Sequence, residues 1–344
     1  MTGEMTHSES RKGILWKIAI PVIIGIGVVI WLFYNEFNPE AIRQVRFTWH
    51  AWVGIFLALV AIVGRDGGMA WRFRALTDRE LPWSRAVNVT MLCEFTSAIT
   101  PSSVGGSALS MFFLNKEGIK MGRATTLTMT ILLLDELFFV ISSPLIFLFV
   151  PYGDIFAFDD GSAVKGIRAA FWIVYGLIFI WTAVLFLGII VKPTAIRRML
   201  VSLFRFRLLS RWLPALTELA DNMVETSHEI RKRSFGWWIE AFAATSLSWI
   251  SRYLVVNALI WGFVPGASQS LVFARQFVVW ALLMFSPTPG GSGVSEWLFK
   301  AYYGDMITGG GVVMLLALMW RLLTYYIYLI IGLFLLPSFL KRKK

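Results

Sequence analysis

The sequence predicts an all-α, polytopic integral membrane protein with about six full spans and two re-entrant helical hairpins in an inverted pseudo-repeat. Three observations predict this fold class. Of the 344 residues, 57% are hydrophobic and only 15% are charged, whereas ordinary soluble domains carry roughly 25% charged residues. The charges fall in short blocks between apolar runs of about 20 residues, the length that crosses a bilayer as a helix. Two further apolar runs are each interrupted by proline and glycine.

The apolar runs give the predicted elements in chain order. Six runs are predicted to cross the membrane completely, and they are residues 14–34, 49–64, 125–149, 167–191, 237–262 and 311–336. Two more runs, 83–114 and 271–303, each contain Thr-Pro and Gly-Gly-Ser, which interrupt a helix. The residues predicted to form the two unwound stretches are Thr100, Pro101, Gly105, Gly106, Ser107, Thr288, Pro289, Gly290, Gly291 and Ser292.

The basic residues predict how the two interrupted runs cross the membrane, because cytoplasmic loops collect Lys and Arg. Basic residues concentrate in the N-terminal flank, in segments 65–85, 115–123 and 192–235, and in the C-terminal tail. If 83–114 crossed once, the basic segment 115–123 would lie outside and the acidic segment 151–163 inside. If 83–114 instead returns to the face that it left, and 271–303 does so from the opposite face, each loop falls on its expected side. Both termini are then cytoplasmic.

This threading divides one membrane domain, 1–344, into two halves. The first half, 14–191, contains hairpin 83–114, and the second half, 237–340, contains hairpin 271–303. Unwound backbone at membrane depth is tolerated only where protein or a water-filled cavity surrounds it, and paired interrupted segments are typical of transporters with a site near the midplane. Segment 192–235 interleaves Arg with Leu and Phe. This pattern predicts interfacial helices that fasten the halves together or contact anionic headgroups at the cytoplasmic face.

Several other function classes have no support in the sequence. A single cysteine, Cys93, excludes an internal disulfide and a cysteine-based metal cluster. The three histidines, His7, His50 and His228, are too scattered to suggest a metal site, so no metal or other cofactor is expected. No G-x-x-x-x-G-K-[ST] stretch predicts a nucleotide site. The excess of 32 Lys and Arg over 21 Asp and Glu lies between spans, which argues against a nucleic-acid partner.

Charged side chains inside the predicted membrane segments are the candidate site, because each costs a few kcal/mol at bilayer depth. They are Glu94, Asp135, Glu136, Arg252, Arg275, Glu296 and Arg321. One interpretation is that they form ion pairs that fasten the bundle. The other is that some of them bind a zwitterionic or anionic headgroup. Arg252 and Arg321 are the strongest candidates for a lipid phosphate, since the guanidinium fork grips two oxygens. Glu94, Glu296 and Asp135 are candidates for binding an amine or a coupling proton.

Three further expectations concern position. Asp135 and Glu136 are adjacent and point about 100° apart on a helix, so at most one of them is expected to line the same cavity. Arg275 is expected to reach the outer interface. Three arginines of the 65–85 segment are expected to anchor the chain at the cytoplasmic headgroups, and they are Arg65, Arg72 and Arg74.

Three stretches of the chain resemble a known family. They are TPSSVGGSALSMFFLNKEG at 100–118, SPTPGGSGVSE at 286–296, and MWRLLTYYIYLIIGL at 319–333. Together they resemble the flippase-like membrane domain of lysylphosphatidylglycerol synthases and its stand-alone relatives, over about residues 14–340. The resemblance implies a bacterial cytoplasmic-membrane protein that moves a lipid between leaflets. In the two-domain relatives, an attached transferase makes that lipid, an aminoacylated phosphatidylglycerol.

The sequence departs from that pattern in two places. No synthase domain is expected after Lys344, so synthase activity is not expected here. Ser107 and Ala108 stand where an acidic residue is expected after the first Gly-Gly, which leaves the identity of the lipid open. The expected function is a lipid flippase. The alternatives are a membrane-embedded enzyme that modifies lipid headgroups and a non-transporting partner subunit of a lipid synthase.

Overall fold

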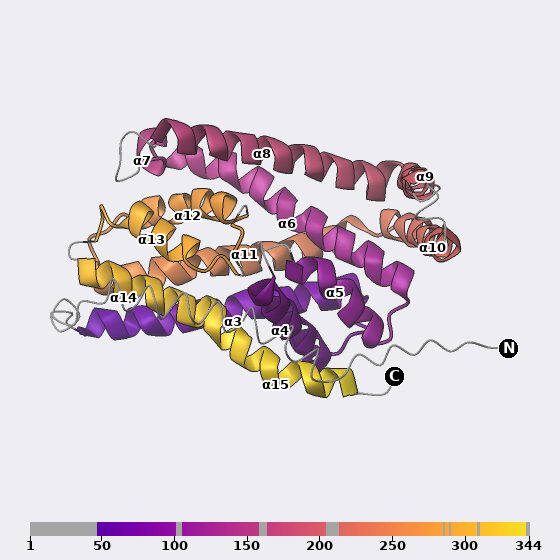
Figure 1. Ribbon diagram of the computed structural model, residues 1–344, viewed down its shortest axis with the longest axis horizontal. Helices are drawn as coiled ribbons and strands as arrows, with labels where there is room; N and C mark the ends of the chain where they lie inside the picture. The colour runs from indigo at the N-terminus through magenta and orange to yellow at the C-terminus, as the bar shows by residue number, and fades with distance from the viewer. Residues whose placement is uncertain are drawn as a thin grey trace.

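In the computed structural model, the described part of the chain is helical and contains no strand. It comprises residues 47–100, 105–157, 164–203, 213–284, 286–288, 290–307 and 310–341. The predicted span 14–34 and two of the predicted break residues, Pro101 and Pro289, lie outside the described residues. The long helices run roughly along the longest axis of the molecule (Figure 1). This arrangement is the one expected of a bundle that crosses a bilayer.

Long helices form the frame of the bundle. They are α3 (Trp49–Leu76), α6 (Met121–Phe149), α8 (Val164–Phe186), α11 (Phe235–Phe263), α14 (Gly310–Arg321) and α15 (Ile327–Lys341). Among the described residues, 4 stretches are long and apolar enough to cross a membrane, and they are Trp49–Leu76, Met121–Phe149, Lys165–Val191 and Gly311–Lys341. Helix α11 has 29 residues but is not one of these stretches. The prediction of an all-α polytopic membrane protein is confirmed.

Two π-helical turns continue the frame helices. Residues Leu187–Val191 extend α8, and residues Leu322–Tyr326 join α14 to α15. The structure therefore runs as one helical stretch from Gly311 to Lys341. A π-helical turn holds an extra residue and is frequent at functional sites. The second turn directly follows Arg321, one of the candidate site residues.

Helices α3 and α11 pack closely because small residues line their contact. A Cβ added to Gly54 would lie 2.6 Å from the Cα of Gly262, and a Cβ added to Gly68 would lie 2.7 Å from the backbone N of Ser248. Small residues allow the backbones of membrane helices to approach in this way. Helix α3 also extends beyond the predicted span 49–64 and ends at Leu76.

Each interrupted apolar run folds as a helical hairpin. The first hairpin consists of α4 (Trp83–Ile99) and α5 (Gly105–Lys116), and the second of α12 (Gln269–Leu283) and α13 (Val294–Tyr303). An ion pair of 3.4 Å between Arg85 and Glu117 joins the outer ends of the first hairpin. In the second hairpin, Arg275 in the first half of α12 pairs with Asp305, just beyond the end of α13, with bonds of 2.7 and 2.8 Å. Each hairpin thus returns to the end of the molecule at which it began.

The two hairpins lie in opposite halves of the molecule and meet in the centre. Helices α12 and α13 share one half with α7 (Tyr152–Ile155), whereas α4 and α5 share the other with α10 (Leu213–Arg231) (Figure 1). The backbone N–H of Gly290 donates to the carbonyl of Thr100 at 3.3 Å. A Cβ on Gly290 would lie 2.1 Å from the Tyr325 ring. The close approach of the two breaks therefore requires glycine at this position.

The first break is shorter than predicted. Gly105, Gly106 and Ser107, which were expected in the unwound stretch, form the first turn of α5. The reason is packing: a Cβ on Gly106 would lie 2.1 Å from the carbonyl O of Cys93, so glycine is needed where α5 touches α4. In the second break, Gly290 and Gly291 have positive φ angles of 55° and 71°, which glycine adopts readily. These two residues are unwound as predicted.

Helices α9 (Pro193–Leu203) and α10 occupy most of the described part of segment 192–235. They lie together at one end of the molecule (Figure 1), and Arg197 on α9 pairs with Asp221 on α10. The loops at this end are joined by further ion pairs. Arg123 contacts Glu80 at 2.7 Å and Arg233 contacts Asp78 at 2.5 Å. This end of the bundle is accordingly rich in arginine.

Candidate functional site: a charged cavity between the hairpin tips

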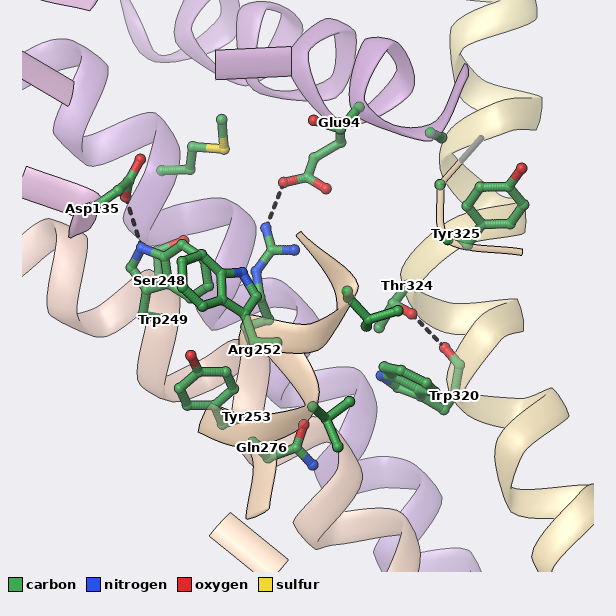
Figure 2. Close-up of a pocket in the computed structure, with 18 of the residues that line it drawn as sticks. Glu94, Asp135, Ser248, Trp249, Arg252, Tyr253, Gln276, Trp320, Thr324 and Tyr325 are labelled. Atoms are coloured by element: carbon green, nitrogen blue, oxygen red, sulfur yellow. Dashed lines mark hydrogen bonds and ion pairs between the residues drawn. The ribbon is translucent and has the colours of Figure 1, made fainter. Parts of the chain in front are cut away.

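A cavity of about 180 Å³ lies in the centre of the bundle, where the tips of the two hairpins meet. Its walls come from α3, α4, α6, α11, α12 and the α14–α15 stretch, so both halves of the chain contribute (Figure 2). The charged residues that line it are Arg72, Glu94, Asp135, Glu136, Arg252 and Arg321. Trp249, Trp280 and Trp320 supply much of the apolar lining. Charges and large apolar surfaces thus share one site inside an apolar bundle.

The carboxylate of Glu94 is shared between two arginines. Arg252 Nη2 donates to Glu94 Oε1 at 2.8 Å, and Arg65 pairs with Glu94 Oε2. Arg65 also lies 3.4 Å from Asp66, whose Oδ2 accepts a hydrogen bond of 2.7 Å from Tyr328. The Arg65 side chain is 1% exposed and the Arg252 side chain is 33% exposed. Glu94 therefore joins a fully buried arginine to one that reaches the cavity.

Asp135 is held by two partners from different helices. It pairs with Arg72 on α3, and it accepts a hydrogen bond of 2.7 Å from the indole N–H of Trp249 on α11 (Figure 2). Arg72 also donates to the hydroxyl of Thr245 at 3.4 Å. The resulting contact joins α3, α6 and α11 on one wall of the cavity. Asp135 is therefore neutralised from within the protein.

Arg321 lines the cavity and forms a further buried pair with Glu296, which lies behind it. Arg321 Nε donates to Glu296 Oε1 at 2.9 Å, and Arg321 Nη2 donates to Ser292 Oγ at 3.2 Å. The other oxygen of Glu296 accepts from the backbone N–H of Gly293 and the hydroxyl of Ser295, each at 2.8 Å. Glu296 thus caps the N-terminus of α13, where a negative charge is favourable. Its role is to fix Arg321 to the tip of the second hairpin.

The structure brings most of the predicted site residues to one place. Arg252, Arg321, Glu94 and Asp135 line the cavity together with Gly290 and Gly291 of the second break. Glu296 does not line it and lies behind Arg321 as its partner. Each of these charged residues has a partner of opposite charge, as the ion-pair interpretation expected. The same residues also surround a cavity, as the headgroup interpretation expected.

One expectation about neighbouring residues is wrong. Asp135 and Glu136 both line the cavity, although adjacent side chains leave a helix about 100° apart.

Arg275 contacts α7 and is buried there rather than exposed. Its side chain is 1% exposed, and it donates to the carbonyls of Asp154 and Tyr302 and to the carboxylate of Asp305. These acceptors satisfy the guanidinium inside the protein.

Arg65 and Arg72 were expected at the cytoplasmic headgroups, but both are buried on α3 and belong to the charged cluster. Arg74 is partly buried, donates to the carbonyl of Leu81 at 3.1 Å and stacks on the Trp83 ring. The spacing of Arg65 and Arg72 could have indicated that both lie on one buried face of a helix. Residues seven apart lie on one face of a helix, and Ala58, Ala61 and Gly68 extend that face as a small-residue stripe. A continuous helix facing inward explains both features.

The arrangement can bind an anion at Arg252. Among the described residues, Arg252 donates one hydrogen bond, from Nη2 to Glu94, and its guanidinium lies 5.2 Å from the centre of the Trp249 ring. Its other donors are available to a phosphate, whose oxygens match the guanidinium fork. The described residues contain no group of three or more His, Cys, Asp or Glu that is placed to hold a metal ion.

Comparison with known proteins places the chain in a family. The family described as the lysylphosphatidylglycerol synthase TM region matches residues 17–332. A protein of Archaeoglobus fulgidus named as a UPF0104 membrane protein is 23% identical over 329 residues, which cover 92% of this chain and 94% of that protein. No solved structure matches the chain. The match extends over both hairpins and the whole cavity, and the chain therefore belongs to the family of the lysylphosphatidylglycerol synthase transmembrane region.

Proposed function

We propose that this protein translocates a phospholipid, or a related anionic or aminoacylated lipid, between the leaflets of the membrane. The family relation supports a lipid-related membrane function. The observation that carries the proposal is the cavity between the two hairpin tips, which Arg252 and Arg321 both line within an apolar bundle. A headgroup needs such a polar path, because crossing the hydrocarbon region without one leaves its charges unsolvated.

We also propose that the hairpins are re-entrant and enter from opposite faces of the membrane. Both ends of the first hairpin lie in the arginine-rich half with α10, and both ends of the second lie in the other half with α7 (Figure 1). Cytoplasmic loops are enriched in Lys and Arg. The α10 end is therefore assigned to the cytoplasm, with both termini there, in a bacterial cytoplasmic membrane. The two hairpins would then be the equivalent elements of an inverted repeat.

Translocation in this scheme combines binding at the cavity with movement of the acyl chains through lipid. Arg252 holds the phosphate while Glu94 remains neutralised by Arg65, so the pairing of the bundle survives substrate binding. No nucleotide-binding motif is present in the sequence. We therefore propose that transport runs downhill, is coupled to an ion, or depends on a lipid synthase as partner. We expect no enzymatic activity and no nucleic-acid partner.

Replacing Arg252 with glutamine is expected to slow leaflet exchange of a fluorescent anionic lipid by about tenfold or more, because a hydrogen bond to a charged group contributes about 1.5–3 kcal/mol. The measurement uses purified protein in vesicles, with an impermeant reductant that bleaches only outer-leaflet label. Arg85→Gln is the matched control, since the Arg85 side chain is 53% exposed and lies away from the cavity. We expect wild-type exchange in that control.

The Arg252 experiment also separates the alternatives. Arg321→Lys keeps the positive charge but lacks the fork, so partial exchange is expected. Unchanged exchange in Arg252→Gln, in a protein that inserts normally, would contradict the proposal. Chemical modification of the headgroup by the purified protein would identify an embedded enzyme instead. Absence of exchange in the wild-type protein until a lipid synthase is added would identify a partner subunit.

The sidedness of the hairpins is testable by cysteine labelling in a Cys93→Ser background. Gly153→Cys and Gly266→Cys are suitable outer positions, since an added Cβ there has nothing within 4 Å, and Lys120→Cys is a suitable inner position because it is exposed. In intact cells, an impermeant maleimide is expected to label the first two and to label Lys120→Cys only after permeabilisation. The Cys93→Ser protein alone serves as the blank. Labelling of Lys120→Cys in intact cells would refute re-entry of the first hairpin.

A further inference from the structure

Glu136 is the one acidic side chain lining the cavity for which the described residues supply no opposite charge. Arg65 and Arg252 are opposed by Asp66 and Glu94, Arg72 by Asp135, and Arg321 by Glu296. Glu136 is 6% exposed, and its Oε2 is buried without a hydrogen-bond partner among the described residues. The charged cluster thus carries one negative charge in excess when Glu136 is ionised.

Two neutral polar groups in the cavity also lack partners within the described part of the chain. The hydroxyl of Tyr253 on α11 and the side-chain N of Gln276 on α12 are buried and form no hydrogen bond there. Figure 2 draws both on the lower side of the cavity, below Arg252, and Tyr253 packs at 4.8 Å on Phe277, the residue that follows Gln276. Tyr253 also lies within electrostatic range of Glu136. The Tyr253 hydroxyl therefore provides a further oxygen ligand in the cavity that the Glu136 carboxylate lines.

An isolated ionised carboxylate in a low-dielectric interior is strongly unfavourable, so such a group takes up a proton or a counter-charge. Among the described residues, the titratable side chains within electrostatic range of Glu136 are Asp135 and Tyr253. Asp135 is already neutralised by Arg72, and the Tyr253 hydroxyl is neutral. Neither can compensate the charge of Glu136. The compensating positive charge must therefore come from outside the described chain.

We infer that Glu136, with Tyr253, binds a single positive charge that enters the cavity together with the anion held at Arg252. A carboxylate and a hydroxyl oxygen can accept from an ammonium or coordinate a monovalent cation. The charge has two sources: an ammonium on the lipid headgroup itself, or a proton or sodium ion from solution. The inference deepens the proposed function. The binding measurements below do not depend on lipid translocation, and only the vesicle exchange assay rests on the proposed function.

The test compares wild type with Glu136→Gln, which keeps the shape and removes the charge. Glu218→Gln, at an exposed position on α10, is the control. Purified full-length protein in detergent is titrated with two labelled lipids of identical acyl chains, a phosphatidylglycerol and a phosphatidylethanolamine. Each titration is repeated at pH 6 and at pH 8. It is also repeated with sodium as the cation and with a bulky organic cation in its place. The same variants are then compared in the vesicle exchange assay.

If the charge is the headgroup ammonium, Glu136→Gln weakens binding of phosphatidylethanolamine by about tenfold and leaves phosphatidylglycerol unchanged. If the charge comes from solution, both lipids bind wild type with an affinity that depends on pH or sodium, and Glu136→Gln abolishes that dependence. Equal affinities of wild type and Glu136→Gln for both lipids under all conditions overturn the inference. Because binding is measured without transport, a protein that binds as expected but exchanges no lipid contradicts only the proposed function.

Discussion

Replacing Glu94 with glutamine is expected to lower the free energy of unfolding by about 3–5 kcal/mol, the range found when one partner of a buried ion pair is removed. Glu94 on α4 is the acceptor for both Arg65 on α3 and Arg252 on α11. Glutamine cannot neutralise either guanidinium, and Arg65 is almost completely buried. The remaining acid near Arg65 is Asp66, at 3.4 Å, which already accepts from Tyr328.

The Glu94 variant is measured by unfolding of the purified protein in mixed detergent micelles, followed by circular dichroism. Glu80→Gln is the control. Its carboxylate is 53% exposed and pairs with Arg123 at 2.7 Å, and an exposed pair of this kind contributes less than about 1 kcal/mol. Similar losses in the two variants would show that Glu94 does not hold the charged cluster together.

Replacing Gly68 with leucine is expected to separate α3 from α11 and to lower the free energy of unfolding by about 3 kcal/mol or more, at the upper end of overpacking effects. The new side chain would begin 2.7 Å from the backbone N of Ser248 and 2.9 Å from the carbonyl O of Ala244. These are backbone atoms of a helix and cannot move aside singly. The whole of α11 would have to shift, and Arg252 would shift with it.

Gly67→Leu is a matched control for the Gly68 variant. The two glycines are adjacent on α3, and a Cβ added to Gly67 meets nothing within 4 Å. Because leucine favours a helix over glycine by roughly 0.8 kcal/mol, the stability of Gly67→Leu is expected to equal or exceed that of wild type. The same detergent unfolding assay measures both. A loss of stability in Gly67→Leu as large as in Gly68→Leu would indicate that helix flexibility, rather than close packing, governs this contact.

The sequence predicts the helices well where hydropathy alone determines them, and less well where a charge is neutralised at a distance. The α6 span was predicted at 125–149 and lies at Met121–Phe149. Helix α3 was predicted to end at residue 64, because Arg65 and Arg72 suggested a cytoplasmic loop. Their partners are supplied by other helices, Glu94 and Asp135. These partners are distant in the sequence, so a prediction from neighbouring residues treats each arginine as unpaired and too costly to bury.

The candidate site was likewise predicted where local hydropathy was informative and missed where distant residues form pairs. The depth of Arg252 and Arg321 in apolar segments was sufficient to select them, and the structure places both at the cavity. The pairing of Arg321 with Glu296 depends on the sharp turn at Gly293, where φ is 85°. The isolation of Glu136 is a property of the assembled bundle. It becomes visible only when each arginine has been assigned to its acid.

Because of the π-helical turn at Leu322–Tyr326, the α14–α15 stretch contacts both halves of the protein. In an uninterrupted α-helix, Arg321 and Tyr328 are seven residues apart and share one face. The extra residue in the wide turn rotates everything after it by about 100°. Arg321 therefore engages Glu296 of the second hairpin, while Tyr328 turns to Asp66 on α3 and Gly332 to Phe95 on the first hairpin. The added residue thus allows one helical stretch to contact both Glu296 and Asp66, which a regular α-helix with both side chains on one face could not do.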